Sequence, residues 1–163
     1  VASSIANLNA RVLVLTGSEL APGEVAWPPG VQVRNYVPHR TVLPGAALVV
    51  THGGMGTLMA AFSAGVPTLC LPLGRDQVAN ARKARALGAS ALLAPDSGTA
   101  EIQRAVEAAL ASRPLRAGAN RMAVSVRGYR AGSRAVDVLE RPGRRGNESR
   151  ASHSSSTSVL SQP

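Results

Sequence analysis

Residues 51–67 read THGGMGTLMAAFSAGVP, so a histidine and three glycines stand between an apolar run and an alanine-rich run that ends at a proline. The apolar run before them, residues 46–51, predicts a buried parallel strand, and residues 57–64 predict a helix. Glycines at such a junction have two explanations. They form a tight turn, or they let an anion approach the amides at the N-terminus of the helix. The spacing alone favours neither.

Strands and helices alternate on both sides of this junction. The predicted strands are residues 11–17, which read as a buried strand, 31–38, 46–51, 66–72 and 90–95. The predicted helices are residues 57–64, 76–87, 100–112 with Thr99 as N-cap, and 117–140 with interruptions near Gly128 and Gly132, besides a helical turn in 39–45. This alternation predicts an α/β fold: a Rossmann-like parallel sheet with helices on both faces.

The composition of the 163 residues fits one domain followed by a tail. Residues 1–141 carry most of the apolar side chains, whereas residues 142–163 are rich in Arg, Gly and Ser and are expected to be disordered. Cys70 is the one cysteine and is expected to be a small buried side chain. The sequence has no apolar run of about 18 residues and no signal-peptide pattern. We therefore expect a cytoplasmic protein without a membrane partner.

The formal net charge of +9 raises the question of nucleic acid as a partner. Several arginines lie in or beside the tail, and the basic residues show neither interleaved aromatic residues nor a known nucleic-acid motif. We expect no nucleic-acid partner, although a basic nucleic-acid-binding module stays an alternative. No cluster of Asp, Glu, His or Cys has metal-ligand spacing, so no metal is expected.

The loops after the predicted strands are where a sheet of this class binds ligands. The glycines after residue 51 expose backbone amides near the start of a helix, whose partial positive charge favours phosphate. A histidine ring nitrogen and a threonine hydroxyl add two side-chain donors. The residues expected at this anion site are His52, Gly53, Gly54, Gly56, Thr57 and Leu58, with free amides at the last three.

A longer string, residues 35–89, resembles the donor-nucleotide signature of glycosyltransferase family 1, the two-domain GT-B enzymes. The resemblance lies in the aromatic-x-Pro-x of residues 36–39, the His-x-Gly-x-x-Thr of 52–57, the Gly-Val-Pro of 65–67, and the Asp-Gln followed by Asn-Ala in 76–81. HGGMGT is most similar to the bacterial antibiotic-type branch. The resemblance implies the C-terminal, donor-binding half of a GT-B fold.

The resemblance also implies roles for single residues. Val37 and His39 would meet the nucleobase, partly through the backbone. His52 and the amides of residues 54–57 would hold the donor diphosphate, with Thr57 contacting a phosphate.

Asp76 and Gln77 would hydrogen-bond the hydroxyls of the sugar. The alternative for this pair is helix capping by Asp76. The family often has a ribose-binding Glu three residues after the Ser or Thr, and this chain has Ala60 there. A lost carboxylate contact costs about 1.5–3 kcal/mol unless another group replaces it. Weaker nucleotide binding or a different ribose contact is therefore expected.

The family transfers a hexosyl or deoxyhexosyl group from a UDP- or dTDP-sugar to a hydroxyl of a small-molecule acceptor, with inversion and without an obligatory metal or other cofactor. Its catalytic base lies in the N-terminal domain, which these residues do not include. No catalytic residue is therefore expected here, and the chain alone is expected to be inactive unless a partner chain supplies that domain. A non-catalytic fragment that binds no donor is a further alternative.

The family pattern equates residues 11–17 with the second strand of the sheet and residues 31–38 with the third. The first, central strand of the Rossmann order is then lacking. We therefore expect residues 11–16 and 46–50 to form no well-ordered ladder with each other.

Overall fold

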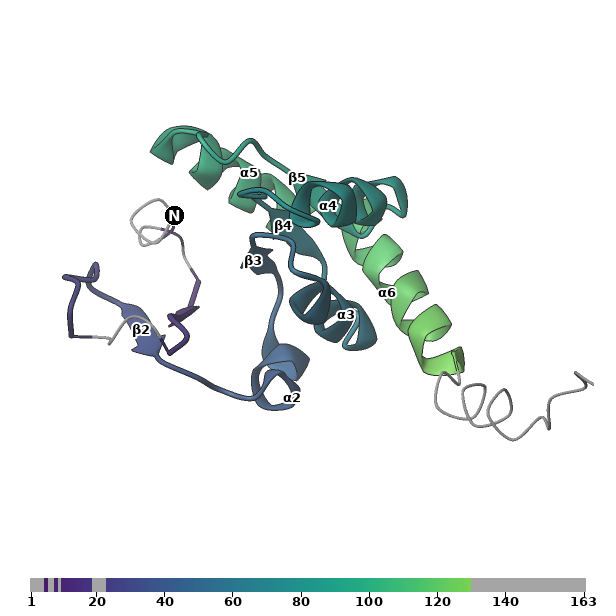
Figure 1. Ribbon diagram of the computed structural model, residues 1–163, viewed down its shortest axis with the longest axis horizontal. Helices are drawn as coiled ribbons and strands as arrows, with labels where there is room; N and C mark the ends of the chain where they lie inside the picture. The colour runs from purple at the N-terminus through teal and green to yellow at the C-terminus, as the bar shows by residue number, and fades with distance from the viewer. Residues whose placement is uncertain (1–4, 6–7, 9, 19–22, 130–163) are drawn as a thin grey trace, which may run out of the picture. The chain divides into compact units, whose positions relative to one another are not determined.

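The computed structural model describes residues 5, 8, 10–18 and 23–129 (Figure 1). The tail predicted for residues 142–163 and the end of the helical region predicted to residue 140 lie outside the described residues. No helix in the described part of the chain is long and apolar enough to cross a membrane.

The strands form two parallel sheets. The first pairs β1 (Val12–Leu15) with β2 (Val31–Arg34), and the second has the order β3 (Val49–Thr51), β4 (Thr68–Cys70), β5 (Ser90–Leu92). Among the described residues no ladder joins β1 to β3. The prediction that residues 11–16 and 46–50 do not pair is confirmed, and the expected single sheet is present as two.

The strands are shorter than predicted, and β1 is not the buried strand that its apolar sequence indicates. Leu13 is 39% exposed and Leu15 is 38% exposed, because alternate side chains of β1 face solvent. By contrast, all three residues of β4 are buried, since this strand lies between two neighbours and under helices on both faces.

The helices lie near their predicted positions. They are α2 (His39–Val42), the 3-10 turn η1 (Leu43–Gly45), α3 (Met55–Ser63), α4 (Gln77–Ala86), α5 (Thr99–Ala111) and α6 (Arg113–Gly128). Several boundaries differ from the prediction by one to four residues, for example the start of α3 at Met55 instead of residue 57, and two of the differences concern helix caps. The N-cap of α5 is Gly98, so Thr99 is already helical. Helix α6 begins at Arg113, because the Ser112 hydroxyl accepts a hydrogen bond from the Leu115 amide and caps it there.

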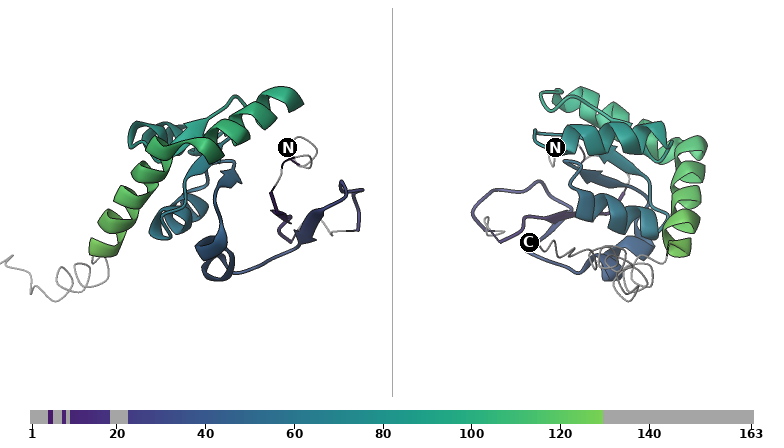
Figure 2. Two further views of the ribbon diagram at one scale, coloured as in Figure 1. Left: turned by 180° about the vertical axis from the view of Figure 1, so that it is seen from behind. Right: turned by 45° about the vertical axis from the view of Figure 1, so that its right-hand side comes forward.

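The β3–β4–β5 sheet carries helices on both faces, as expected (Figure 2). Side chains of β4 alternate between the two layers. Leu69 packs on the side of α5, whereas Cys70 packs on the side of α3, α4 and α6. The Cys70 thiol is fully buried and lies 3.2 Å from the Ser90 hydroxyl, so the prediction of a buried cysteine is confirmed.

Helix α6 approaches the turn after α4 so closely that its contact residue must be glycine. Gly88 ends the turn with a φ of +70°. A Cβ on Gly118 would overlap the carbonyl group of Gly88. This backbone contact holds α6 against the sheet on the same side as α3 and α4.

Candidate functional site

The loop between β3 and α3 is anchored to the next helix by Gly53. This residue is buried with a φ of +91°, and its amide donates to the Thr51 hydroxyl at 3.2 Å. A Cβ at Gly53 would lie 3.1 Å from the carbonyl oxygen of Gln77. Both the left-handed backbone and the contact with α4 therefore require glycine here.

His52 lies against the start of α3. Its side chain is exposed, and a Cβ on Gly54 would lie only 2.7 Å from its Nε2. Gly54, the N-cap residue of α3, thus leaves room for the imidazole beside the N-terminus of that helix. The arrangement allows a ring nitrogen to donate to an anion bound there.

The N-terminus of α3 has no internal compensation for its partial positive charge. The helix has neither a side-chain cap nor an acidic residue in its first turn. Thr57 lies in that first turn, as predicted, and Gly56 is exposed with nothing within 4 Å of an added Cβ. The Leu58 amide is already bonded to the Gly54 carbonyl at 3.1 Å, so its expected role as a free donor is wrong. The amides before it, at residues 54–57, are the ones that the helix leaves without an intrahelical acceptor.

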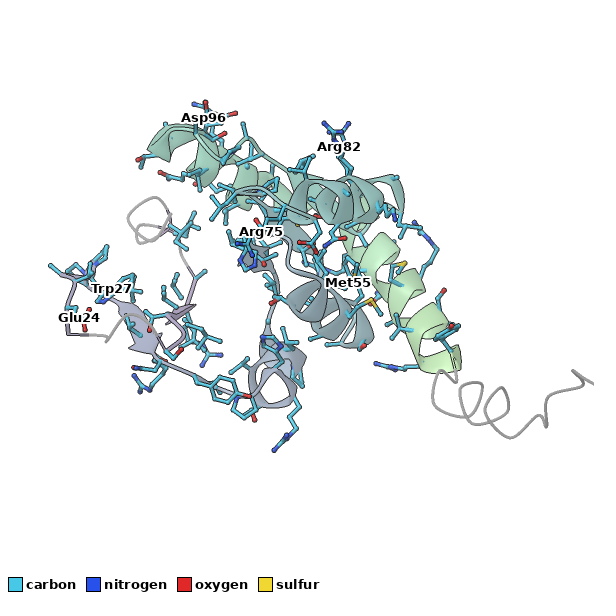
Figure 3. The ribbon with its side chains drawn as sticks, in the orientation of Figure 1. Glu24, Trp27, Met55, Arg75, Arg82 and Asp96 are labelled. Atoms are coloured by element: carbon cyan, nitrogen blue, oxygen red, sulfur yellow. The ribbon has the colours of Figure 1, made fainter. Side chains whose placement is uncertain are left out.

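The loop between β4 and α4 is shaped by Gln77. Its side-chain Oε1 accepts a hydrogen bond from the Leu73 backbone amide at 2.9 Å, and its backbone amide donates to the Gly74 carbonyl at 3.2 Å. Arg75 (labelled in Figure 3) has a φ of +54° and is the one non-glycine residue of the described part with positive φ. The side-chain amide nitrogen of Gln77 keeps its two protons for other partners.

Asp76 is the N-cap residue of α4, but its side chain makes no capping hydrogen bond, so the capping alternative is wrong for the carboxylate. Asp76 is exposed, and its Oδ2 accepts from Asn80 Nδ2 at 2.8 Å. The same nitrogen donates to the Gly53 carbonyl at 3.3 Å. Asn80 therefore joins the loop that contains His52 to the loop that contains Asp76.

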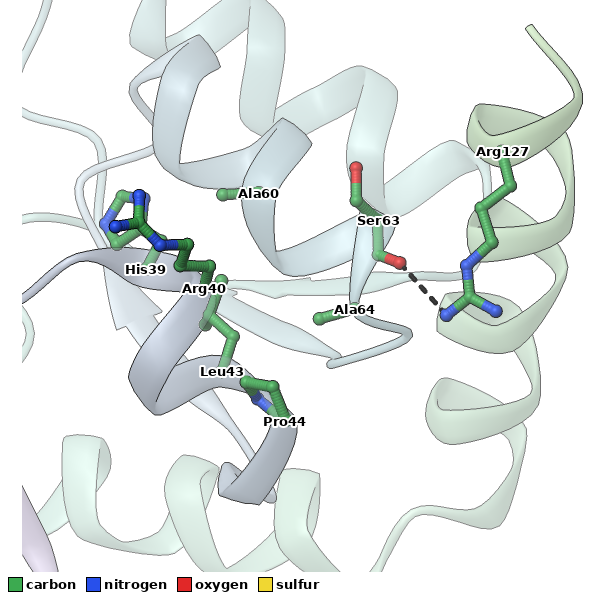
Figure 4. A pocket seen from close by; sticks show the side chains of 8 residues that line it. All are labelled: His39, Arg40, Leu43, Pro44, Ala60, Ser63, Ala64 and Arg127. Atoms are coloured by element: carbon green, nitrogen blue, oxygen red, sulfur yellow. Dashed lines mark hydrogen bonds between the residues drawn. The ribbon is translucent and has the colours of Figure 1, made fainter.

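A pocket of about 390 Å³ lies between α2, α3 and α6 (Figure 4). It brings together His39, the first residue of α2, and Ala60 of α3, the position where the family often has Glu. Arg127 reaches it from α6 and donates to the Ser63 carbonyl at 3.3 Å. The lining is completed by Arg40, Leu43, Pro44 and Ala64.

The predicted residues thus fall into two groups. The first is the pair of adjoining loops with His52, Gly53, Gly54, Gly56, Thr57, Asp76 and Gln77. In the second, His39 lines the pocket, whereas Val37 is half-buried just before α2 and is not part of the lining.

Sequence reasoning assigned no role to Asn80 or Arg127. Asn80 could have been found from its spacing of four residues from Asp76 on one helix. The sequence did not indicate a role for Arg127, because its hydrogen-bond partner Ser63 lies 64 residues away in the chain. No group of three or more potential metal ligands occurs within the described ranges.

Comparisons with known proteins point to one kind of protein. Residues 1–130 match the family described as erythromycin biosynthesis protein CIII-like, C-terminal domain. The chain is 36% identical over 134 residues to the demethyllactenocin mycarosyltransferase of Streptomyces fradiae, covering 80% of this chain and 29% of that protein. It is 34% identical over 141 residues to the TDP-daunosamine transferase DnrS of Streptomyces peucetius, covering 85% and 33%.

The solved structures agree with the sequence matches. The calicheamicin glycosyltransferase CalG4 superposes with a TM-score of 0.77 at 30% identity, over 85% of this chain and 37% of that one. The chain therefore spans about a third of the length of the relatives that it matches.

Proposed function

This chain belongs to the family of erythromycin biosynthesis protein CIII-like C-terminal domains, and we propose that it binds the nucleotide-sugar donor of a glycosyltransferase. The whole enzyme would move a hexosyl or deoxyhexosyl group from the donor to a hydroxyl of a small molecule. The observation that carries the proposal is the N-terminus of α3, an exposed glycine-containing turn beside His52 and without an acidic residue. Such a turn suits a diphosphate.

The proposed diphosphate site uses the backbone more than side chains. The free amides of residues 54–57 would donate to the phosphate oxygens, with the Thr57 hydroxyl and the His52 ring beside them. During transfer the same donors would stabilise the negative charge that develops on the departing diphosphate. Inversion and independence from metal, as in the family, are part of this proposal.

Asp76 and Gln77 have complementary free atoms for a sugar. Asn80 occupies one carboxylate oxygen of Asp76, which leaves Oδ1 to accept from sugar hydroxyls. The Leu73 amide occupies Oε1 of Gln77, which leaves the side-chain NH₂ group to donate. One acceptor and one donor on neighbouring residues suit the hydroxyl groups of a hexose.

The nucleoside would lie along Val37 and His39, towards the pocket that contains Ala60. The methyl group of Ala60 cannot accept a hydrogen bond from a ribose diol. A nucleotide without the 2′-hydroxyl therefore loses no hydrogen bond at this position. We therefore favour a dTDP-sugar over a UDP-sugar. The name of the 34% identical TDP-daunosamine transferase is consistent with this choice.

The acceptor and the catalytic base would come from residues outside this chain, in a further domain or a partner chain. The chain by itself is then a donor-binding protein without turnover.

Isothermal titration of the full chain with TDP, UDP, thymidine and DNA tests the proposal. We expect saturable binding of TDP, weaker binding of UDP, and a loss of TDP affinity in His52→Ala but not in Arg82→Ala. Arg82 is exposed on α4 and serves as the matched surface control (Figure 3). Salt-sensitive DNA binding without nucleotide binding would instead support the nucleic-acid alternative. Binding of neither would support a fragment that binds no donor.

A further inference from the structure

Asn80 is the polar side chain that joins the two loops of the donor site. It is only 8% exposed and lies one turn inside α4. Its NH₂ group makes two hydrogen bonds, one to the Gly53 carbonyl at 3.3 Å and one to Asp76 Oδ2 at 2.8 Å. An amide nitrogen has two protons, so both are used inside the protein and neither is free for a ligand.

The two acceptors belong to parts of the site with different tasks. Gly53 is buried with positive φ, and its peptide orientation sets the direction of the chain into α3. Asp76 is exposed, and without a partner its side chain could exchange between χ1 rotamers and its carboxylate could turn about χ2. The bond to Asn80 restrains these motions through Oδ2 and does not use Oδ1.

We propose that Asn80 is a positioning residue of the donor site, which holds the Asp76 carboxylate in the orientation that accepts sugar hydroxyls and fixes it to the diphosphate-binding loop. The inference rests on the proposed function, because it takes Asp76 as a sugar contact. It assigns Asn80 no contact with the donor. Loss of its bond to the Gly53 carbonyl would weaken TDP binding as well, whereas loss of its bond to Asp76 would lower the additional affinity that the sugar gives.

The gain in affinity due to the sugar can be measured directly. Isothermal titration gives the dissociation constants of TDP and TDP-glucose for the full chain, and their ratio is the gain in affinity due to the sugar. We expect Asn80→Ala and Asp76→Ala each to lower this gain about fivefold, and the double variant to lower it no further than Asp76→Ala alone. A general loosening of the fold would lower the affinities for TDP and TDP-glucose together and leave their ratio unchanged. A lower ratio therefore indicates that Asn80 positions Asp76.

Two further variants keep the test decisive. Asn80→Ser retains one donor in a smaller side chain and replaces Asn80→Ala if the latter does not fold. Gln103→Ala removes a side-chain amide that bonds Glu107 at 3.1 Å one turn along α5, and it should leave the ratio unchanged.

The outcomes separate the inference from the function on which it rests. If Asp76→Ala lowers the sugar-dependent gain but Asn80 variants keep it, the positioning role is wrong and the sugar contact stands. Additive losses in the double variant also overturn the positioning role. If wild-type protein shows no gain from the sugar, the proposed role of Asp76 fails and the inference fails with it.

Discussion

Gly56→Ala separates the two explanations of the glycine-rich junction, because the fold and the proposed ligand make opposite demands on this position. Gly56 is the second residue of α3, is exposed, and has nothing within 4 Å of an added Cβ. Alanine is favoured over glycine in a helix by about 0.5–1 kcal/mol. If the glycine served only the turn, the substitution would therefore be tolerated or would slightly stabilise the protein.

A diphosphate at the N-terminus of α3 would meet the new methyl group. The methyl group would hold phosphate oxygens away from the amides of residues 54–57. Losing one hydrogen bond to a charged group costs about 1.5–3 kcal/mol, which is roughly 10- to 100-fold in the dissociation constant. We expect Gly56→Ala to raise the midpoint of thermal unfolding by about 1–3 °C and to weaken TDP binding by at least tenfold.

Thermal unfolding by circular dichroism and titration calorimetry with TDP measure the two effects on one preparation. Gly128→Ala is the matched control, since Gly128 is a helical, exposed glycine of α6 that also has nothing within 4 Å of an added Cβ. It should leave TDP affinity unchanged. Unchanged TDP binding in Gly56→Ala would refute the assignment of the diphosphate to this turn. A lower midpoint of thermal unfolding in Gly56→Ala would mean that an added Cβ at this position does not lie in open space.

Three further substitutions test the packing and the donor preference. Gly118→Ala should lower the free energy of unfolding by more than about 2 kcal/mol in urea, because its Cβ would overlap the Gly88 carbonyl, and normal stability would disprove that contact. Ile102→Ala, at a position only 5% exposed under the sheet, should cost about 2–4 kcal/mol in the same assay, whereas a cost below 1 kcal/mol would mean that α5 does not cover the sheet. Ala60→Glu should move the ratio of UDP to TDP affinity about tenfold towards UDP by calorimetry, and an unchanged ratio would place the ribose elsewhere.

Local sequence determined those parts of the protein that depend on neighbours in the chain. An apolar run, three glycines and an alanine-rich run predicted β3, the turn and α3 in order, because strand, turn and helix formation respond to residues within a few positions. The link between Asp76 and Asn80 also follows from helical spacing, since residues four apart share one face.

Tertiary structure decided the features that join distant segments. The contact of Asn80 with Gly53 spans 27 residues, and that of Arg127 with Ser63 spans 64. The hydrophobic periodicity of the sequence does not predict such contacts, because they depend on how whole helices pack. The separation of the strands into two sheets, and the exposure of Leu13, likewise depend on which strands and helices lie beside β1. An apolar run is compatible with either burial or exposure until its neighbours are placed.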